Sequence, residues 1–135
     1  MRKKMRITAI LAGVVFIVSV FTGVALAKQE EIWDMLKDDH GQVKDTLGKM
    51  KDTMDPKLLN QVQQMLTMHM QFEEQNLYPI LEKNPDTKAI AVQSKNEHQA
   101  AKQVLDRLVK SQGDKTQWAA NVNQLDQLVS THVKN

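Results

Sequence analysis

Three short stretches that interrupt helices divide the chain after residue 28 into segments of similar length. They are Asp55-Pro56, Asn84-Pro85-Asp86 and Gly113-Asp114. The intervening segments span residues 29–53, 57–83, 87–111 and 115–134. Gln, Lys, Leu, Met and Ala dominate these segments, which favours helices, and Asp55 and Asp114 are suited to begin two of them. Because helices joined by short links pack as antiparallel neighbours, we predict an all-α, up-down-up-down antiparallel four-helix bundle.

The residues before this region have a different composition. Residues 1–6 carry four positive charges and no acid, residues 7–24 are almost wholly apolar, and an Ala-Leu-Ala site ends at Ala27. This order is typical of a secretory signal peptide, here residues 1–27. Because the apolar run is long for a signal peptide, an uncleaved membrane anchor is the alternative. In either case we expect residues 28–135 to be exported to the periplasm, the cell envelope or the extracellular space.

The charge and the cysteine content of residues 28–135 exclude one class of function and one means of stabilisation. The chain has 18 basic and 16 acidic residues, and removal of the leader leaves 14 basic against 16 acidic, so the net charge becomes negative. No nucleic-acid-binding patch is therefore indicated. The chain has no cysteine, so this single small domain must be stabilised by packing or by a bound ligand rather than by disulfides.

The second helical segment carries an imidazole and a carboxylate on its predicted apolar face. His69 and Glu73 are four residues apart, so their side chains lie one above the other on one side of a helix. The apolar residues assigned to the same face are Leu58, Val62, Met65, Phe72, Leu77 and Ile80. Burying both polar groups is costly unless a partner compensates for the lost water, and a metal ion would do so.

The other three histidines fall on the apolar stripes of the other three segments. His40, His98 and His132 each stand where the three- and four-residue spacing expects an apolar side chain. The stripe residues are Ile32, Leu36, Val43, Leu47, Met50 and Met54, then Ile90, Ala101, Val104, Leu105 and Leu108, then Trp118, Val122, Leu125 and Val129. A lone inward histidine is commonly an ordinary core residue, but four landing there by chance has odds of about three per cent.

The heights of these side chains also agree. At a rise of about 1.5 Å per residue, distances counted from the turns match to within roughly 5 Å. We therefore predict one layer of metal ligands formed by His40, His69, Glu73, His98 and His132.

At these positions the sequence resembles the hemerythrin-like, or HHE cation-binding, family. The resemblance is carried by Asp39-His40, by HMQFEEQNLYPIL beginning at His69, by Asn96-Glu97-His98 and by His132-Val133. It covers nearly all of residues 28–135, and it implies a four-helix bundle around two non-haem iron ions bridged by oxo and carboxylate ligands. The four histidines would be iron ligands, Glu73 would be a bridging carboxylate, and dioxygen or another small diatomic molecule would be the bound partner.

The sequence departs from the family pattern in two places. Some members carry a second histidine one turn away on the third helix, where this chain has Ser94 and Lys102, so one iron would keep an open position. The family's second carboxylate would fall at position 136, one residue after Asn135. Two alternatives follow: the sequence is truncated at the C-terminus, or the protein has one bridging acid and favours a single metal.

Other residues near the predicted ligands have ordinary explanations. We expect Glu74 and Glu97 to be solvent-facing charges rather than hydrogen-bond partners of a ligand histidine. The methionines and aromatic residues, Tyr78 included, are expected to pack in the core. Phe72, one turn from His69, is the aromatic residue placed to form a wall of a dioxygen site.

We therefore expect a small exported di-iron protein that binds, senses or buffers dioxygen, nitric oxide or iron. We do not expect an enzyme, because the sequence offers no nucleophile–base arrangement and its ionisable core residues already serve as ligands. The alternatives are an envelope stress or chaperone-like helical protein with an incidental mononuclear iron or zinc site, and a bundle that binds b-type haem through Met and His. Zinc in place of iron also stays open, because histidine-rich sites accept both metals.

Overall fold

The structure, a computed structural model, describes residues 23–134, and side-chain burial from residue 30 onward. The basic and most of the apolar part of the predicted leader, residues 1–22, lies outside the described residues. The elements are α2 (Gly23–Asp52), α3 (Pro56–Phe72), the π-helix η1 (Glu73–Leu77), α4 (Tyr78–Glu82), α5 (Pro85–Lys110) and α6 (Lys115–His132). The described chain is therefore all-helical, as predicted. None of the helices within residues 23–134 combines the length and hydropathy needed to cross a membrane.

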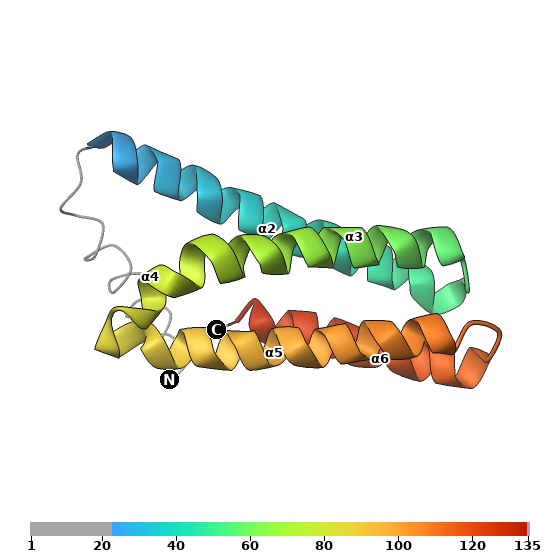
Figure 1. The fold of residues 1–135 in the computed structure, drawn as a ribbon. Helices are drawn as coiled ribbons and strands as arrows, with labels where there is room; N and C mark the ends of the chain where they lie inside the picture. Colours follow the sequence, from blue (N-terminus) through green and yellow to red (C-terminus); the bar gives the residue numbers. More distant parts are fainter. Residues whose placement is uncertain (1–22, 135) are drawn as a thin grey trace, which may run out of the picture.

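The helices form a bundle of four rods, because α3, η1 and α4 follow one another as a single rod (Figure 1). Helix α2 packs against α3 and α6, while α5 packs against α6, α4 and α3. Figure 1 shows the α2–α3 and α5–α6 loops at the same end of the bundle and the α4–α5 turn at the opposite end. Each rod therefore runs antiparallel to the next and lines a common interior.

Polar residues begin the helices where the sequence indicated. Asp55, Asn84 and Asp114 each accept a hydrogen bond from a backbone N–H two or three residues later, at 2.8–3.0 Å. Such a bond satisfies one of the N–H groups that have no partner within the helix. Gly113 precedes Asp114 with a φ of 97°, a left-handed conformation that favours glycine. The helix starts expected at Asp55 and Asp114 are confirmed.

The core follows the predicted stripe on α6 and most of the stripes on α2 and α5, where Ala91 is buried and the predicted Ile90 is half-buried. Its largest cluster comprises Val43, Leu47, Met50, Leu59, Val62, Leu66, Met70, Ala101, Val104, Leu105, Leu108, Trp118, Val122, Leu125 and Val129. Trp118 Nε1 donates a hydrogen bond to the carbonyl of Met50 at 2.9 Å, which ties α6 to α2. The prediction for Ile32 is wrong, since its side chain is exposed. In Figure 1 the beginning of α2 diverges from the other rods, so this part of the helix has less to pack against.

The predicted face of the second rod also needs correction. On α3 the buried residues are Leu59, Val62, Leu66 and Met70, so the interior line lies one residue later than the predicted Leu58 and Met65, which are half-buried. Beyond Glu73 the error has a clear cause. The π-helix adds one residue to a turn, so that Tyr78 and Leu81 are buried and Ile80 is exposed.

The π-helix arises next to a proline. In a continuous α-helix the N–H of residue 79 would bond to the carbonyl of Gln75, but Pro79 has no N–H and its ring would crowd that carbonyl. The N–H of Tyr78 instead bonds five residues back, to the carbonyl of Glu73. The wider turn thus places the side chain of Tyr78 on the same face as that of Glu73.

Candidate metal centre

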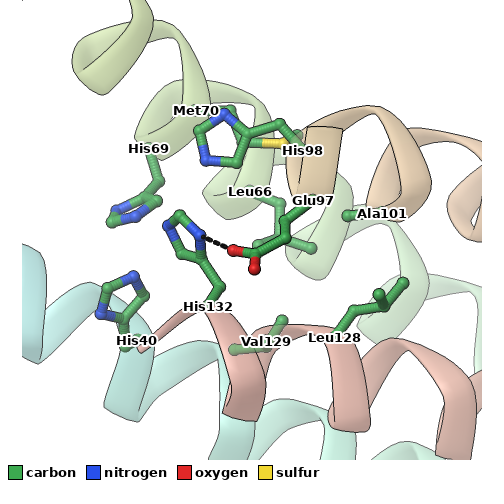
Figure 2. Close-up of a pocket in the computed structure, with 10 residues that line it drawn as sticks. All are labelled: His40, Leu66, His69, Met70, Glu97, His98, Ala101, Leu128, Val129 and His132. Atoms are coloured by element: carbon green, nitrogen blue, oxygen red, sulfur yellow. Dashed lines mark hydrogen bonds and ion pairs between the residues drawn. The ribbon is translucent and has the colours of Figure 1, made fainter. Parts of the chain in front are cut away.

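The predicted ligands meet inside the bundle. His40, His69, Glu73 and His132 each offer a donor atom that lies within 4.8 Å of the others. His98 reaches the same layer, with its Nε2 3.1 Å from Glu73 Oε2. Figure 2 shows the four rings approaching one another from α2, α3, α5 and α6. The structure therefore brings all five residues together, and their role as metal ligands remains a prediction.

Glu73 lies at the centre of this layer with only 4 % of its surface exposed. Its Oε1 is 3.4 Å from His69 Nε2, and its Oε2 is 3.2 Å from His132 Nε2. Burial by itself would raise the pKa of Glu73, but the contacts with His132, His69 and His98 outweigh burial and hold the pKa well below its usual range. Glu73 is therefore an ionised carboxylate with histidine nitrogens on both of its oxygens.

Three of the histidines are oriented by carboxylates on their outer sides. His69 Nδ1 lies 3.3 Å from Asp39 Oδ2, His98 Nδ1 3.0 Å from Glu74 Oε1, and His132 Nδ1 2.9 Å from Glu97 Oε2. An ionised carboxylate can only accept, so each Nδ1 carries the proton and the Nε2 faces the centre. Histidines that bind metals are commonly held in this way.

These three carboxylates follow the order of the rods along the chain. Asp39 on α2 supports the histidine of α3, Glu74 on η1 supports that of α5, and Glu97 on α5 supports that of α6. Each acid adjoins a predicted ligand in sequence and reaches sideways to the next rod. The expectation that Glu74 and Glu97 are simply solvent-facing charges is therefore wrong. Glu74 also accepts a hydrogen bond from Lys102 at 3.1 Å, and its pKa is lowered because these partners outweigh burial.

Two inward nitrogens have no hydrogen-bond partner among the described residues. They are Nε2 of His40 and Nε2 of His69, and both are buried. Leaving a buried polar atom unpaired costs about 1–3 kcal/mol. Burial, and then the proximity of His69 and His132, lowers the pKa of His40 from 6.5 to about 4, so this ring is neutral near pH 7 and offers a lone pair.

The remaining histidine of the set has the opposite electrostatic environment. Burial would lower the pKa of His132, but hydrogen bonds with Glu73 and Glu97 on its two ring nitrogens outweigh burial and raise the pKa. A metal cation at the centre would take the place of the proton on His132 Nε2, which now faces the Glu73 carboxylate. Four imidazoles, an ionised carboxylate and two buried nitrogens without hydrogen-bond partners among the described residues form a donor set that fits a transition-metal cation.

A small cavity of about 20 Å³ adjoins the histidines (Figure 2). The four rings and Glu97 line one part of it, and the rest is apolar: Leu66, Met70, Ala101, Leu128 and Val129. A space of this size accommodates about one water-sized molecule. Phe72, which the sequence suggested as a wall, is not among the lining residues.

Tyr78 also takes part in this layer, a role that was not predicted from the sequence. The residue packs in the core as expected, but its hydroxyl also lies 2.5 Å from Glu73 Oε2 and 3.0 Å from His98 Nε2. Burial and the nearby Glu73 carboxylate raise the pKa of Tyr78, so the phenol is protonated and donates to Glu73. The signal that could have located this contact is Pro79, because a proline at that place favours an extra residue in the preceding turn.

Comparison with known proteins agrees with this geometry. The family model described as the hemerythrin HHE cation-binding domain matches residues 31–135, a range that contains all five predicted ligands. No curated protein and no solved structure matches the chain.

Proposed function

The chain belongs to the hemerythrin HHE cation-binding family, and from this membership and the histidine layer we propose that it is an exported protein with a non-haem di-iron centre. The centre would bind, sense or buffer dioxygen, nitric oxide or iron. The family match and the cluster of histidines around Glu73 support metal binding. We propose in addition that the metal is iron, that two ions are bound and that the ligand is a small diatomic molecule.

The observation that carries the proposal is that the buried Nε2 atoms of His40 and His69 have no hydrogen-bond partner within the described part of the chain. A protein core rarely retains such atoms unless something binds them. In addition, the carboxylates on the outer sides of His69, His98 and His132 fix the rings with Nε2 inward. A histidine that merely filled the core would need partners for both of its ring nitrogens, whereas Nε2 of His40 and of His69 has no hydrogen-bond partner among the described residues.

Iron in this layer would supply the electrons and the open coordination position that a diatomic ligand requires. The protein's own residues would set how that ligand binds. The five apolar side chains that line the cavity would limit the access of bulk water to the histidines. These side chains offer neither a nucleophile nor a proton donor, which favours reversible binding over catalysis.

Export is supported by the sequence of residues 1–27, which has the order of a secretory leader. N-terminal sequencing of protein recovered from the producing cells tests this part. A mature chain that begins near Lys28 is expected, and a chain that starts at Met1 in the cytoplasmic fraction would contradict it.

Anaerobic reconstitution with Fe²⁺ tests the proposed function. We expect iron to remain bound after desalting, and exposure to dioxygen to produce a near-ultraviolet charge-transfer band. His69→Ala should abolish both the iron and the band. Gln64→Ala, at an exposed position of α3, is the matched control and should behave as the wild type. Wild-type protein that retains no iron would refute the proposal.

A second candidate is a mononuclear iron or zinc site in a helical envelope protein. It is favoured by one observation: His40, His69, Glu73 and His132 alone form a compact four-donor set, which suits one tetrahedral ion. Metal analysis after equal exposure to Fe²⁺ and Zn²⁺ separates the two. Retention of one zinc and no iron would favour this alternative.

A further inference from the structure

Tyr78 is the single tyrosine of the chain, and its hydroxyl lies within the histidine layer. The side chain is 2 % exposed. Tyr78 follows Glu73 by five residues, and the π-helix between them places both side chains on one face, where the phenol donates to Glu73 Oε2 at 2.5 Å. Packing alone would be served equally well by phenylalanine, so the hydroxyl calls for a separate explanation.

The donor atoms around Glu73 fall into two unequal groups. His40, His69 and His132 join Glu73 in the compact set that suffices for one ion. His98 stands outside that set, and a second ion beside it would share the Glu73 carboxylate. The residue one turn before His98 on α5 is the buried Ser94, which provides no additional nitrogen. A second ion would therefore have fewer protein ligands than metal sites usually supply.

Tyr78 contacts the two atoms that a second ion would need. Its hydroxyl is hydrogen-bonded to Glu73 Oε2 and lies 3.0 Å from His98 Nε2. By contrast, the Nε2 atoms of His40 and His69 have no hydrogen-bond partner among the residues described. A first ion can bind to these two nitrogens without breaking a hydrogen bond of theirs, whereas a second ion must displace the contacts made by the phenol.

We propose, resting on the metal-binding function above, that Tyr78 makes the centre load its ions in sequence. The first ion binds to His40, His69, His132 and Glu73. The second binds beside His98 only when the Tyr78 hydroxyl releases Glu73 Oε2 and His98 Nε2. Tyr78 is therefore a positioning residue that determines whether the centre holds one ion or two.

Titration of the metal-free full chain with Co²⁺ tests this inference. Calorimetry and the visible spectrum of Co²⁺ report two steps, of which the second is expected to be weaker. Because the chain has one tyrosine, the tyrosine bands of the ultraviolet resonance Raman spectrum, read where the two tryptophans do not contribute, report Tyr78 alone. We expect these bands to change with the second equivalent rather than with the first.

Tyr78→Phe removes the hydroxyl and keeps the ring. We expect the second step to strengthen at least about fivefold, since no hydrogen bond to the carboxylate has to be broken, while the first step stays within about twofold of the wild type. Thr87→Val is the matched control, because it removes another buried hydroxyl of the same region, one that donates to the carbonyl of Leu81. It should leave both steps unchanged.

The outcomes separate this inference from the function on which it rests. Two steps of equal affinity in the wild type, or a second step unchanged by Tyr78→Phe, would overturn the inference and leave metal binding intact. If Tyr78→Phe does not fold, the wild-type tyrosine spectrum decides, and a change complete at the first equivalent would overturn the inference. If Co²⁺ binds to neither protein, the proposed function fails as well.

Discussion

His40 on α2 and His69 on α3 approach each other edge to face, with ring centroids 4.3 Å apart and planes inclined at 61°. Each directs a buried Nε2 that has no hydrogen-bond partner among the described residues. Two imidazoles at this distance destabilise each other when protonated, and the lowered pKa of His40 reflects burial first and this repulsion second. The pair is thus an unfavourable element of the metal-free fold that a bound cation would make favourable.

Metal removal should destabilise the fold. A cation that binds the folded chain at a concentration of about 100 times its dissociation constant adds about 2.7 kcal/mol. For a domain of this size we expect chelation to lower the Tm by at least about 5 °C. Calorimetric scans with and without chelator measure the shift. An unchanged Tm would instead support an incidental site of the chaperone-like alternative.

The metal-free protein should lose stability as the pH falls from about 6.5 toward 4. The pKa of His40 is lowered from 6.5 to about 4, so its contribution is present above pH 6.5 and is lost as the unfolded chain takes up the proton first. The pKa of Glu73 is lowered from 4.5, so the stabilising contribution of its ionised carboxylate is lost only at more acidic pH. Urea unfolding at pH 7 and pH 5 measures the effect.

His40→Gln should reduce this loss at low pH. His132→Gln should change the pH dependence of stability on the alkaline side instead. The pKa of His132 is raised, so the stabilising contribution of this side chain is present below pH 6.5 and is lost as the pH increases through the raised value. The same pH dependence in the wild type and in His40→Gln would contradict the assignment to His40.

Glu97→Gln should weaken metal binding without removing a ligand. Glu97 Oε2 lies 2.9 Å from His132 Nδ1 and orients the ring toward Glu73. Loss of such a carboxylate typically costs about 10–100-fold in metal affinity. Asp106→Asn changes an exposed acid of the same helix and is the control. Equal affinities of the two variants for Co²⁺ would show that Glu97 has no such role.

Leu66→Ala should enlarge the cavity beside the histidines. Leu66 is buried and lines that cavity, so we expect a stability loss of about 2–5 kcal/mol together with faster association of nitric oxide with the reduced iron protein. Leu59→Ala, at a buried position of α3 that does not line the cavity, should cost similar stability and leave the association rate unchanged. Stopped-flow measurement on both variants checks the difference, and equal rates would contradict the assignment of the cavity to the diatomic ligand.

The bundle and the meeting of the histidines could be predicted because both follow from local rules. The breaks between the rods lie at Pro56, Pro85 and Gly113, and a histidine on each apolar stripe must point into the interior. The place of Tyr78 could not be predicted from a regular helical period, because Pro79 causes an extra residue in the turn before it. The orientation of Glu74 and Glu97 depends on a histidine of the neighbouring rod. The spacing of residues within one helix gives no information about such a contact between helices.

Anomalous diffraction at the iron absorption edge from crystals of the iron-loaded protein tests the central claim most directly. We predict an iron peak at bonding distance from Nε2 of His40 and His69 and from a carboxylate oxygen of Glu73. A weaker second peak beside His98 would accompany it if loading is sequential. Iron bound elsewhere on the chain, or no anomalous peak between these side chains, would contradict the account.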